Sequence, residues 1–318
     1  MRSDQAGSER TARAEQRRGA EAVGTPARRS ALRRTHAAVL GAAARLAYRL
    51  DGTARRLADI RRVERLAPAE LEAEVMARLR AQLAHAFANV PWYREVARRE
   101  RLSPDVFRHY GDLRRLPVLT RHGVRYNMEA LRAEGAPYGP GKMGSTAGST
   151  GEPVHFYQDA SFRRADRAAK LWGYETCGYR LGQPVAVLTG SPIDAPPHRG
   201  AVARLADLAF RNALVVDCYR ITLESIWSAS ADILRHDPAL ITGYASVLAM
   251  YAGFLRDSGL PRPRPVAVQT HAEMLTEDAR ACIEETLGCP VFNRYGCREV
   301  GIVAHECGCH GGLHVAAV

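Results

Sequence analysis

Lysine is almost absent from this chain. Its 318 residues include only Lys142 and Lys170, so arginine supplies nearly all of the 45 basic side chains and the formal net charge of +11. Chemistry that requires a lysine therefore has two candidates. A Walker phosphate loop is excluded, because it needs Lys followed by Ser or Thr after its last glycine, and here Glu152 follows Gly151.

Long apolar runs are missing as well. No stretch of 18 or more apolar residues occurs, which excludes a membrane-spanning helix. The start of the chain has no apolar segment before a cleavage site, so we expect no secretory signal. Seven cysteines, an odd number, then favour reduced thiols and a cytoplasmic location. The hydrophobic content of 46% can fill a sizeable core, as in a soluble globular protein.

The first 35 residues are rich in arginine. Residues 1–35 combine nine arginines with four acids and few apolar side chains. We expect a disordered tail there, followed by one large domain over residues 36–318. No aromatic side chain lies among these arginines, so we expect neither nucleic-acid binding nor membrane insertion. Self-association as a homodimer stays open.

One glycine- and hydroxyl-rich stretch organises the chain. Residues 144–153 read Gly-Ser-Thr-Ala-Gly-Ser-Thr-Gly-Glu-Pro, which predicts a loop because glycine and proline weaken both helices and central strands. Backbone N–H groups and hydroxyls in such a loop converge on anions, most commonly phosphate. A solvated linker is the alternative. The candidate phosphate-binding residues are Ser145, Thr146, Gly148, Ser149, Thr150 and Gly151.

Apolar segments of strand length alternate with helical patterns after this loop. Helices of about 12 residues between short strands predict parallel βαβ units in an α/β fold. The expected strands lie near residues 184–188, 213–217, 238–244, 265–270 and 291–293. The expected helices lie near residues 161–174, 223–236, 245–257 and 276–287. Ligands of such sheets bind at the carboxyl ends of the strands, where residues 271–274 and 293–296 fall.

Three segments together resemble a known family. Residues 145–153, with the aromatic pair Phe156-Tyr157 after them, resemble the phosphate loop of adenylate-forming enzymes. The similarity is greatest to the phenylacetate-CoA ligase branch, which includes capsular polysaccharide biosynthesis proteins. Residues 295–299, Tyr-Gly-Cys-Arg-Glu, resemble that branch's Tyr-Gly-Ser-Arg-Glu. Residues 268–275 match the segment that passes the adenine base and the acyl pocket, in the family's order.

The resemblance implies the large N-terminal domain of an adenylate-forming enzyme, with mostly parallel sheets flanked by helices. It implies activation of a carboxylic acid by ATP and Mg²⁺ to an acyl-adenylate, followed by transfer to a thiol such as CoA. Glu299 would bind Mg²⁺, a hard cation that takes carboxylate and phosphate oxygens, and would act with Arg298 in catalysis. Tyr244 and His271 are candidates for the wall of the acyl pocket, and buried structural roles are the alternative for both. The adenine-binding residues would be Ala272, Glu273, Asn293, Tyr295 and Gly296.

The family also has a small C-terminal lid domain that supplies a lysine for adenylation and brings CoA to the intermediate. This chain ends at Val318, ahead of the corresponding position. We therefore expect the lid domain to be absent and turnover by this chain alone to be slow. The alternative is a truncated, non-catalytic remnant that at most binds nucleotide.

Cysteines and histidines gather near the end of the chain. Their density over residues 305–314 suits a tetrahedral zinc site, with Cys307, Cys309, His310 and His314 as the candidate ligands. The alternative is a glycine-rich hairpin in which these side chains only pack. A zinc-stabilised interaction module with an arginine-rich tail for nucleic acid is a further alternative function.

Overall fold

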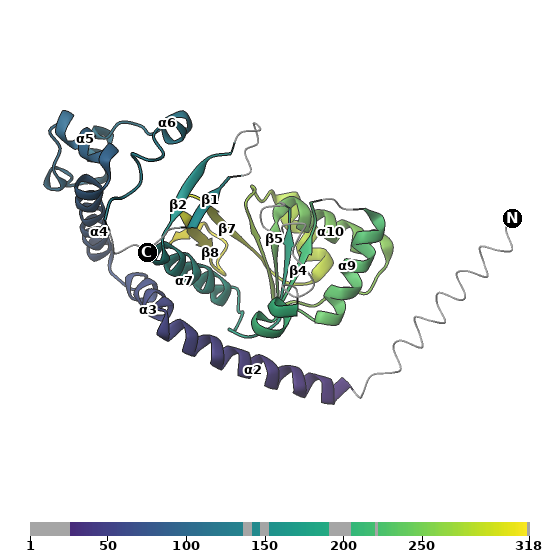
Figure 1. Cartoon of the computed structure of the whole chain (residues 1–318). Helices are drawn as coiled ribbons and strands as arrows, with labels where there is room; N and C mark the ends of the chain where they lie inside the picture. Colours follow the sequence, from purple (N-terminus) through teal and green to yellow (C-terminus); the bar gives the residue numbers. More distant parts are fainter. Residues whose placement is uncertain (1–25, 136–141, 147–152, 191–204, 220–221, 317–318) are drawn as a thin grey trace, which may run out of the picture.

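A computed structural model describes residues 26–135, 142–146, 153–190, 205–219 and 222–316 (Figure 1). The amino-terminal half of this part is mainly helical. Its helices are α2 (Pro26–Leu50), α3 (Thr53–Val63), α4 (Pro68–Asn89), α5 (Pro91–Arg99) and α6 (Arg121–Tyr126), with short 3₁₀ turns at Pro104–Val106 and Tyr110–Arg115. Within the described ranges, no helix combines the length and the apolar character needed to cross a bilayer.

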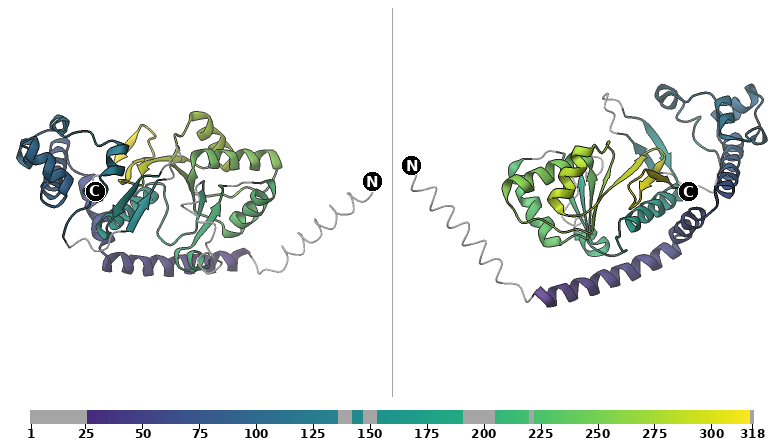
Figure 2. Two further views of the ribbon diagram at one scale, coloured as in Figure 1. Left: turned by 45° about the horizontal axis from the view of Figure 1, so that its top comes forward. Right: turned by 180° about the vertical axis from the view of Figure 1, so that it is seen from behind.

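Helix α2 extends into the segment that we expected to be a tail. It begins at Pro26, so residues 26–35 are helical, while residues 1–25 lie outside the described part. Its alanines, leucines and arginines are strong helix formers, and Arg33 Nη1 donates to Asp237 Oδ2 at 2.8 Å. Figure 2 shows α2 along one edge of the molecule. The helix ends before Gly52, whose φ of 85° is left-handed and favours glycine.

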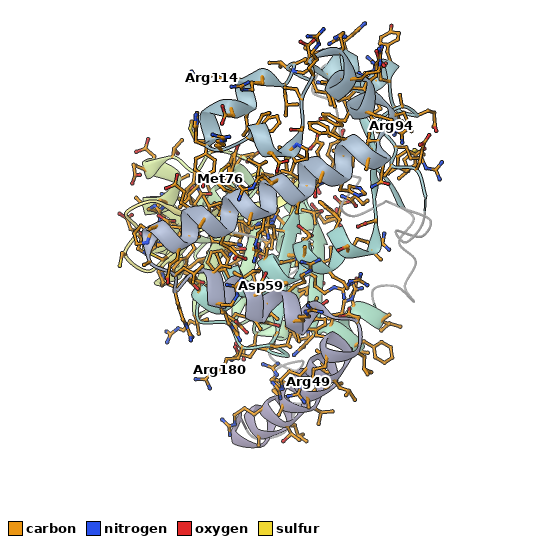
Figure 3. All side chains as sticks on the ribbon, turned by 90° about the vertical axis from the view of Figure 1, so that its left-hand side faces the viewer. Arg49, Asp59, Met76, Arg94, Arg114 and Arg180 are labelled. Atoms are coloured by element: carbon orange, nitrogen blue, oxygen red, sulfur yellow. The ribbon has the colours of Figure 1, made fainter. Side chains whose placement is uncertain are left out.

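Helices α3 and α4 are joined by a network of charges. Arg78 Nη2 donates to Asp59 Oδ2 and to Glu74 Oε1, both at 2.7 Å, and Arg62 also contacts both acids. Figure 3 shows α3 with Asp59 beside α4 with Met76. The network is partly exposed, so its role is to fix the angle between the helices more than to stabilise the fold.

The carboxyl-terminal half forms a seven-stranded sheet in the order β4-β3-β5-β6-β7-β8-β9. The pairs from β4 to β7 are parallel, and β8 and β9 extend the sheet in antiparallel fashion. This arrangement confirms the α/β prediction. The strands are β3 (Val185–Thr189), β4 (Ala213–Asp217), β5 (Leu240–Tyr244), β6 (Ala267–His271), β7 (Val291–Cys297), β8 (Gly301–Glu306) and β9 (Leu313–Val315).

Helices cover both faces of this sheet, as parallel sheets require. One face packs on α9 (Leu223–His236), α10 (Ala245–Ser258) and α11 (Glu277–Leu287) through an apolar core that includes Ile241, Val268 and Val291. The other face packs on α3 and α7 (Ala160–Thr176) through Leu240, Ala267 and Phe292. Because successive side chains alternate between faces, each strand contributes to both cores.

A separate hairpin carries the ends of the phosphate-loop segment. Strands β1 (Lys142–Ser145) and β2 (His155–Gln158) pair antiparallel, with Ser145 opposite His155. Strand β2 leads directly into α7, whose first turn is capped by Asp159, since Oδ1 of that residue accepts from Phe162 N at 2.6 Å. The hairpin and α7 are therefore positioned together.

Strand β8 is tied to helix α11 by a buried ion pair. Arg280 Nη2 donates to both carboxylate oxygens of Glu306, at 2.9 and 3.0 Å, and Asn293 N donates to Glu306 Oε2 at 2.7 Å. Glu306 is 5% exposed. Removing one partner of such a pair leaves the other charge buried and uncompensated.

We predict that Glu306→Gln lowers the free energy of unfolding by about 3–5 kcal/mol, because Arg280 loses its counter-charge. The matched control is Asp232→Asn, which removes the exposed pair with Arg235 and should cost less than about 1 kcal/mol. Urea denaturation of both variants measures the difference. Equal losses in the two variants would contradict a special role for the buried pair.

Candidate functional site

The two motifs that we singled out from the sequence meet in the structure. Gln158 Nε2, at the end of β2, donates to the backbone oxygen of Arg298 at 2.8 Å, and Arg298 Nη1 lies 3.4 Å from the backbone oxygen of Ser145. Figure 1 shows β1 and β2 beside β7 and β8. The β1–β2 hairpin and the turn after β7 thus form one site, although about 150 residues separate them in sequence.

The neck of the predicted phosphate loop is closed by hydrogen bonds. Thr146 N donates to Val154 O, and Val154 N donates to Thr146 Oγ1, both at 3.0 Å. The Thr146 hydroxyl therefore accepts a bond within the neck and retains its proton to donate. Ser145 lies on β1 and is half-buried. Four of the predicted phosphate-binding residues lie outside the described part, namely Gly148, Ser149, Thr150 and Gly151.

The end of β7 presents an aromatic ring and a carboxylate to solvent. Tyr295 is 62% exposed. A Cβ on Gly296 would lie 2.5 Å from Gly301 O, so only glycine allows β7 and β8 to pair so closely at this irregular point of the ladder. Glu299 lies in the turn between these strands, exposed and without a side-chain partner among the described residues. The end of β7 and the turn after it thus offer an exposed aromatic ring and an exposed carboxylate.

Tyr244 and His271 lie next to each other at the carboxyl ends of β5 and β6. The two residues are in register, and their ring centroids are 5.4 Å apart. The Tyr244 ring also lies against Gly190, where a Cβ would come within 3.2 Å of it. Burial, followed by the charges of Arg294 and Lys170, lowers the pKa of His271 well below 6.5. His271 is therefore neutral near pH 7 and offers one donor and one acceptor.

Three predicted adenine-binding residues have structural contacts of their own. Glu273 Oε2 accepts from Ser246 N at 2.8 Å, so this carboxylate caps the first turn of α10. Asn293 Oδ1 accepts from Thr270 Oγ1 at 3.3 Å. Ala272 has a φ of 69°, a left-handed conformation that is costly for alanine and directs the chain away from β6. The adenine contacts of these residues stay a prediction.

The predicted zinc cluster does not form. Among the described residues, which include 301–316, no three His, Cys, Asp or Glu side chains gather in a way that can hold a metal ion. His310 Nδ1 instead lies 3.3 Å from both Arg280 Nη1 and Glu306 Oε1. Cys309 and His314 are exposed. Residues 301–315 form the β8–β9 hairpin, so the alternative of a hairpin with packed side chains is the better description.

A buried polar chain beneath the site escaped the sequence analysis. Arg294 Nη1 lies 3.4 Å from Gln269 Oε1, Gln269 Nε2 lies 3.4 Å from His305 Nδ1, and His305 Nε2 lies 3.0 Å from Ala169 O. The carbonyl oxygen requires His305 to carry its proton on Nε2. Burial and the charge of Arg294 lower the pKa of His305 to about 3. The sequence signal that could have revealed this chain is a glutamine and an arginine inside otherwise apolar strands.

The fold is shared with known enzymes. The structure is similar to that of an open conformation of 2-hydroxyisobutyryl-CoA ligase in complex with 2-HIB-AMP and CoA, with a TM-score of 0.60 and 19% sequence identity. The match covers 78% of this chain and 55% of the ligase. The same ligase in its thioesterification state gives a TM-score of 0.60 and 20% identity. The chain has the fold of the acyl-CoA ligases of the adenylate-forming superfamily.

A comparison of sequences gives one relative. The chain is 25% identical over 212 residues to protein CapK of Staphylococcus aureus, which covers 66% of this chain and 46% of CapK. No family model matches the chain. The chain thus spans about half the length of the proteins that it matches, at 46% of CapK and 55% of the ligase.

The two buried histidines predict acid sensitivity. A histidine in the unfolded chain binds a proton below about pH 6.5, whereas His305 in the fold binds one only near pH 3 and His271 also stays neutral. The unfolded state therefore takes up more protons as the pH falls. The free energy of unfolding should decrease from pH 6.5 downwards, and this contribution should be fully present above pH 6.5.

Urea denaturation between about pH 7.5 and pH 4 measures this dependence. We expect His305→Gln to reduce the slope, because the variant has no proton to gain on unfolding at this position. His314→Gln, which changes an exposed histidine on β9, is the matched control and should keep the full slope. A His305→Gln slope as steep as that of the control would contradict the prediction.

Proposed function

We propose that this protein activates a carboxylic acid with ATP, forming an acyl-adenylate and pyrophosphate, and then passes the acyl group to a thiol such as CoA. The single observation that carries the proposal is the hydrogen-bonded contact between the β1–β2 hairpin and the Arg298 turn. It joins the strands that flank a hydroxyl-rich segment to the end of β7, which bears an exposed aromatic ring and, in the following turn, a carboxylate. That combination is suited to a nucleotide triphosphate.

Each motif has a proposed role in this reaction. The loop between Thr146 and Val154 would bind the phosphates through backbone N–H groups and through the hydroxyls of Ser149 and Thr150. Tyr295, which is mostly exposed, would stack on the adenine ring. Arg298, held beside the hairpin, would stabilise charge on the phosphoryl oxygens as the acid attacks the α-phosphate.

The residues present also fit Mg²⁺. Glu299 offers carboxylate oxygens, has no side-chain partner among the described residues and lies in the turn that contacts the hairpin. Mg²⁺ is commonly held by one or two carboxylates together with phosphate oxygens. When bound, the ion would supply charge neutralisation to the phosphates. For zinc, the described residues contain no suitable cluster.

The acid would lie at the carboxyl ends of β5 and β6, where Tyr244 and His271 are in contact. The 2-hydroxyisobutyryl-CoA ligase structures support this proposal, because they hold 2-HIB-AMP and CoA on the same fold. The similarity to CapK supports the same class of protein. Acyl transfer to the thiol is proposed for the whole protein, since the chain spans about half of its relatives.

The activity predicts acid-dependent exchange of pyrophosphate into ATP. We expect Arg298→Met to lower the exchange rate by about 100- to 1000-fold, the usual effect of losing one preorganised charge at the reacting phosphate. Labelled pyrophosphate and a panel of aryl and aliphatic acids measure the rate. Binding of ATP with no exchange for any acid would instead support a protein that binds nucleotide without turnover.

Glu299→Gln tests the metal ligand separately from the chemistry. The variant keeps the shape of the side chain and removes its charge, so the increase in ATP affinity caused by Mg²⁺ should fall while metal-free binding changes little. The matched control is Glu285→Gln on the exposed side of α11, which should retain the full effect of Mg²⁺. Calorimetric titration of ATP measures both. A full Mg²⁺ effect in Glu299→Gln would exclude Glu299 as the ligand.

A further inference from the structure

A row of polar side chains crosses the sheet on the face that α7 covers. Val187 in β3, Thr242 in β5, Gln269 in β6 and Phe292 in β7 are partners across the sheet and so point to one face. Two residues further along each strand lie Thr189, Tyr244, His271 and Arg294, of which Tyr244, at the end of β5, also packs against the core on the α9–α11 face. We call these four residues the polar row. It lies at the carboxyl ends of four neighbouring strands, where such sheets bind ligands.

The polar row contains a cation that lacks a carboxylate. Arg294 is half-buried, and its contacts among the described residues are Gln269 Oε1 at 3.4 Å and the neighbouring hydroxyl of Tyr174. The acid whose charge acts on Arg294 is Asp166, which accepts from Ile302 N at 3.1 Å and forms no ion pair with Arg294 in the described part. A half-buried guanidinium is normally paired with an anion.

A second cation, the exposed Lys170 of α7, lies beside Tyr174. Lys170 projects from α7 with its Nζ 5.4 Å from the Tyr174 ring centroid, and its charge acts on His271. Lys170 has no ion pair among the described residues. Arg294 and Lys170 carry two positive charges, and Asp166 carries one negative charge. This region therefore keeps a net charge of one positive unit, while His271 stays neutral.

Unused hydrogen-bond donors lie in the same region. The Thr189 and Thr242 side chains are 4% and 1% exposed, and neither hydroxyl has a partner among the described residues. Buried hydroxyls are nearly always hydrogen-bonded, so two neighbouring hydroxyls without partners indicate a missing acceptor. Both residues lie on the face of Gln269 and next to Tyr244, which is the expected wall of the acyl pocket.

We infer that the polar row binds an acid substrate that carries a second carboxylate, held by Arg294 with the support of Lys170 and the threonine hydroxyls. A planar carboxylate suits bidentate binding by a guanidinium. One negative charge also matches the one positive charge left in this region, whereas a phosphate carries up to two. The inference rests on the proposed function, because it names the class of acid that the same site takes.

The test compares acids of equal length that differ only in the second carboxylate, namely glutarate with valerate and succinate with butyrate. Calorimetric titration of the full chain, with AMP present, measures binding without turnover. We expect each dicarboxylate to bind at least about 10-fold more tightly than its partner, the usual gain from a charged hydrogen bond. Equal affinities, or no dicarboxylate binding at millimolar concentrations, would overturn the inference.

Variants then test whether the polar row causes the preference for dicarboxylates. Arg294→Met should weaken dicarboxylate binding by about 10- to 100-fold and leave monocarboxylate binding within about 3-fold. Arg294→Lys keeps the charge and should retain part of the preference if Arg294→Met fails to fold. Arg180→Met, which removes an exposed arginine just beyond α7, is the matched control and should bind like the unchanged chain. An equal loss for both acids would show that Arg294 holds the reacting carboxylate.

These experiments distinguish failure of the dicarboxylate inference from failure of the proposed function. If exchange of pyrophosphate fails for every acid while glutarate binding depends on Arg294, the row is a dicarboxylate site and the activity is wrong. If exchange proceeds equally well with valerate and glutarate, the activity stands and the inference about the second carboxylate falls.

Discussion

In addition to its apolar core, helix α7 makes a few polar contacts with the sheet, and the geometry of the whole site depends on them. His305 Nε2 donates to Ala169 O at 3.0 Å, and Asp166 Oδ1 accepts from Ile302 N at 3.1 Å. A Cβ on Gly173 would overlap the His305 ring, so this glycine allows the helix to lie close to β8. Because β2 runs directly into α7, the same contacts position the β1–β2 hairpin against the Arg298 turn.

The parallel part of the fold was predictable from sequence because its signals are local. Strands β3 to β7 are short apolar segments bounded by proline, glycine or polar residues, and the observed strands fall within the expected ranges or beside them. The start of α2 was misjudged, since an arginine-rich composition is shared by disordered tails and by exposed helices. The β8–β9 hairpin was foreseen only as an alternative to zinc, because cysteine and histidine spacing does not determine where their side chains point. At His310 a left-handed backbone turns the chain, and the ring lies beside Glu306.

Only the site residues that belong to a recognisable sequence motif could be predicted. Tyr295, Arg298 and Glu299 could be named from the sequence, and the structure places Arg298 against the hairpin. The polar row could not be named, since its members belong to four separate strands and share a face only through the register of the sheet. The cap formed by Glu273 on α10 was hidden for the same reason, because its partner Ser246 lies 27 residues away in sequence.

Because lysine is scarce, this protein can be labelled selectively at its few amines. Lys142 and Lys170 are the only lysines in the chain. Lys142 begins β1, shortly before the predicted phosphate loop in sequence, and Lys170 lies on α7, the helix that covers the face of the polar row. Lysine amines are acylated readily, whereas the guanidinium of arginine stays protonated and does not compete. An amine-selective reagent would therefore label this protein near its site and almost nowhere else. Protection of Lys170 from labelling, read as a mass shift on one peptide, would report occupancy of the site directly.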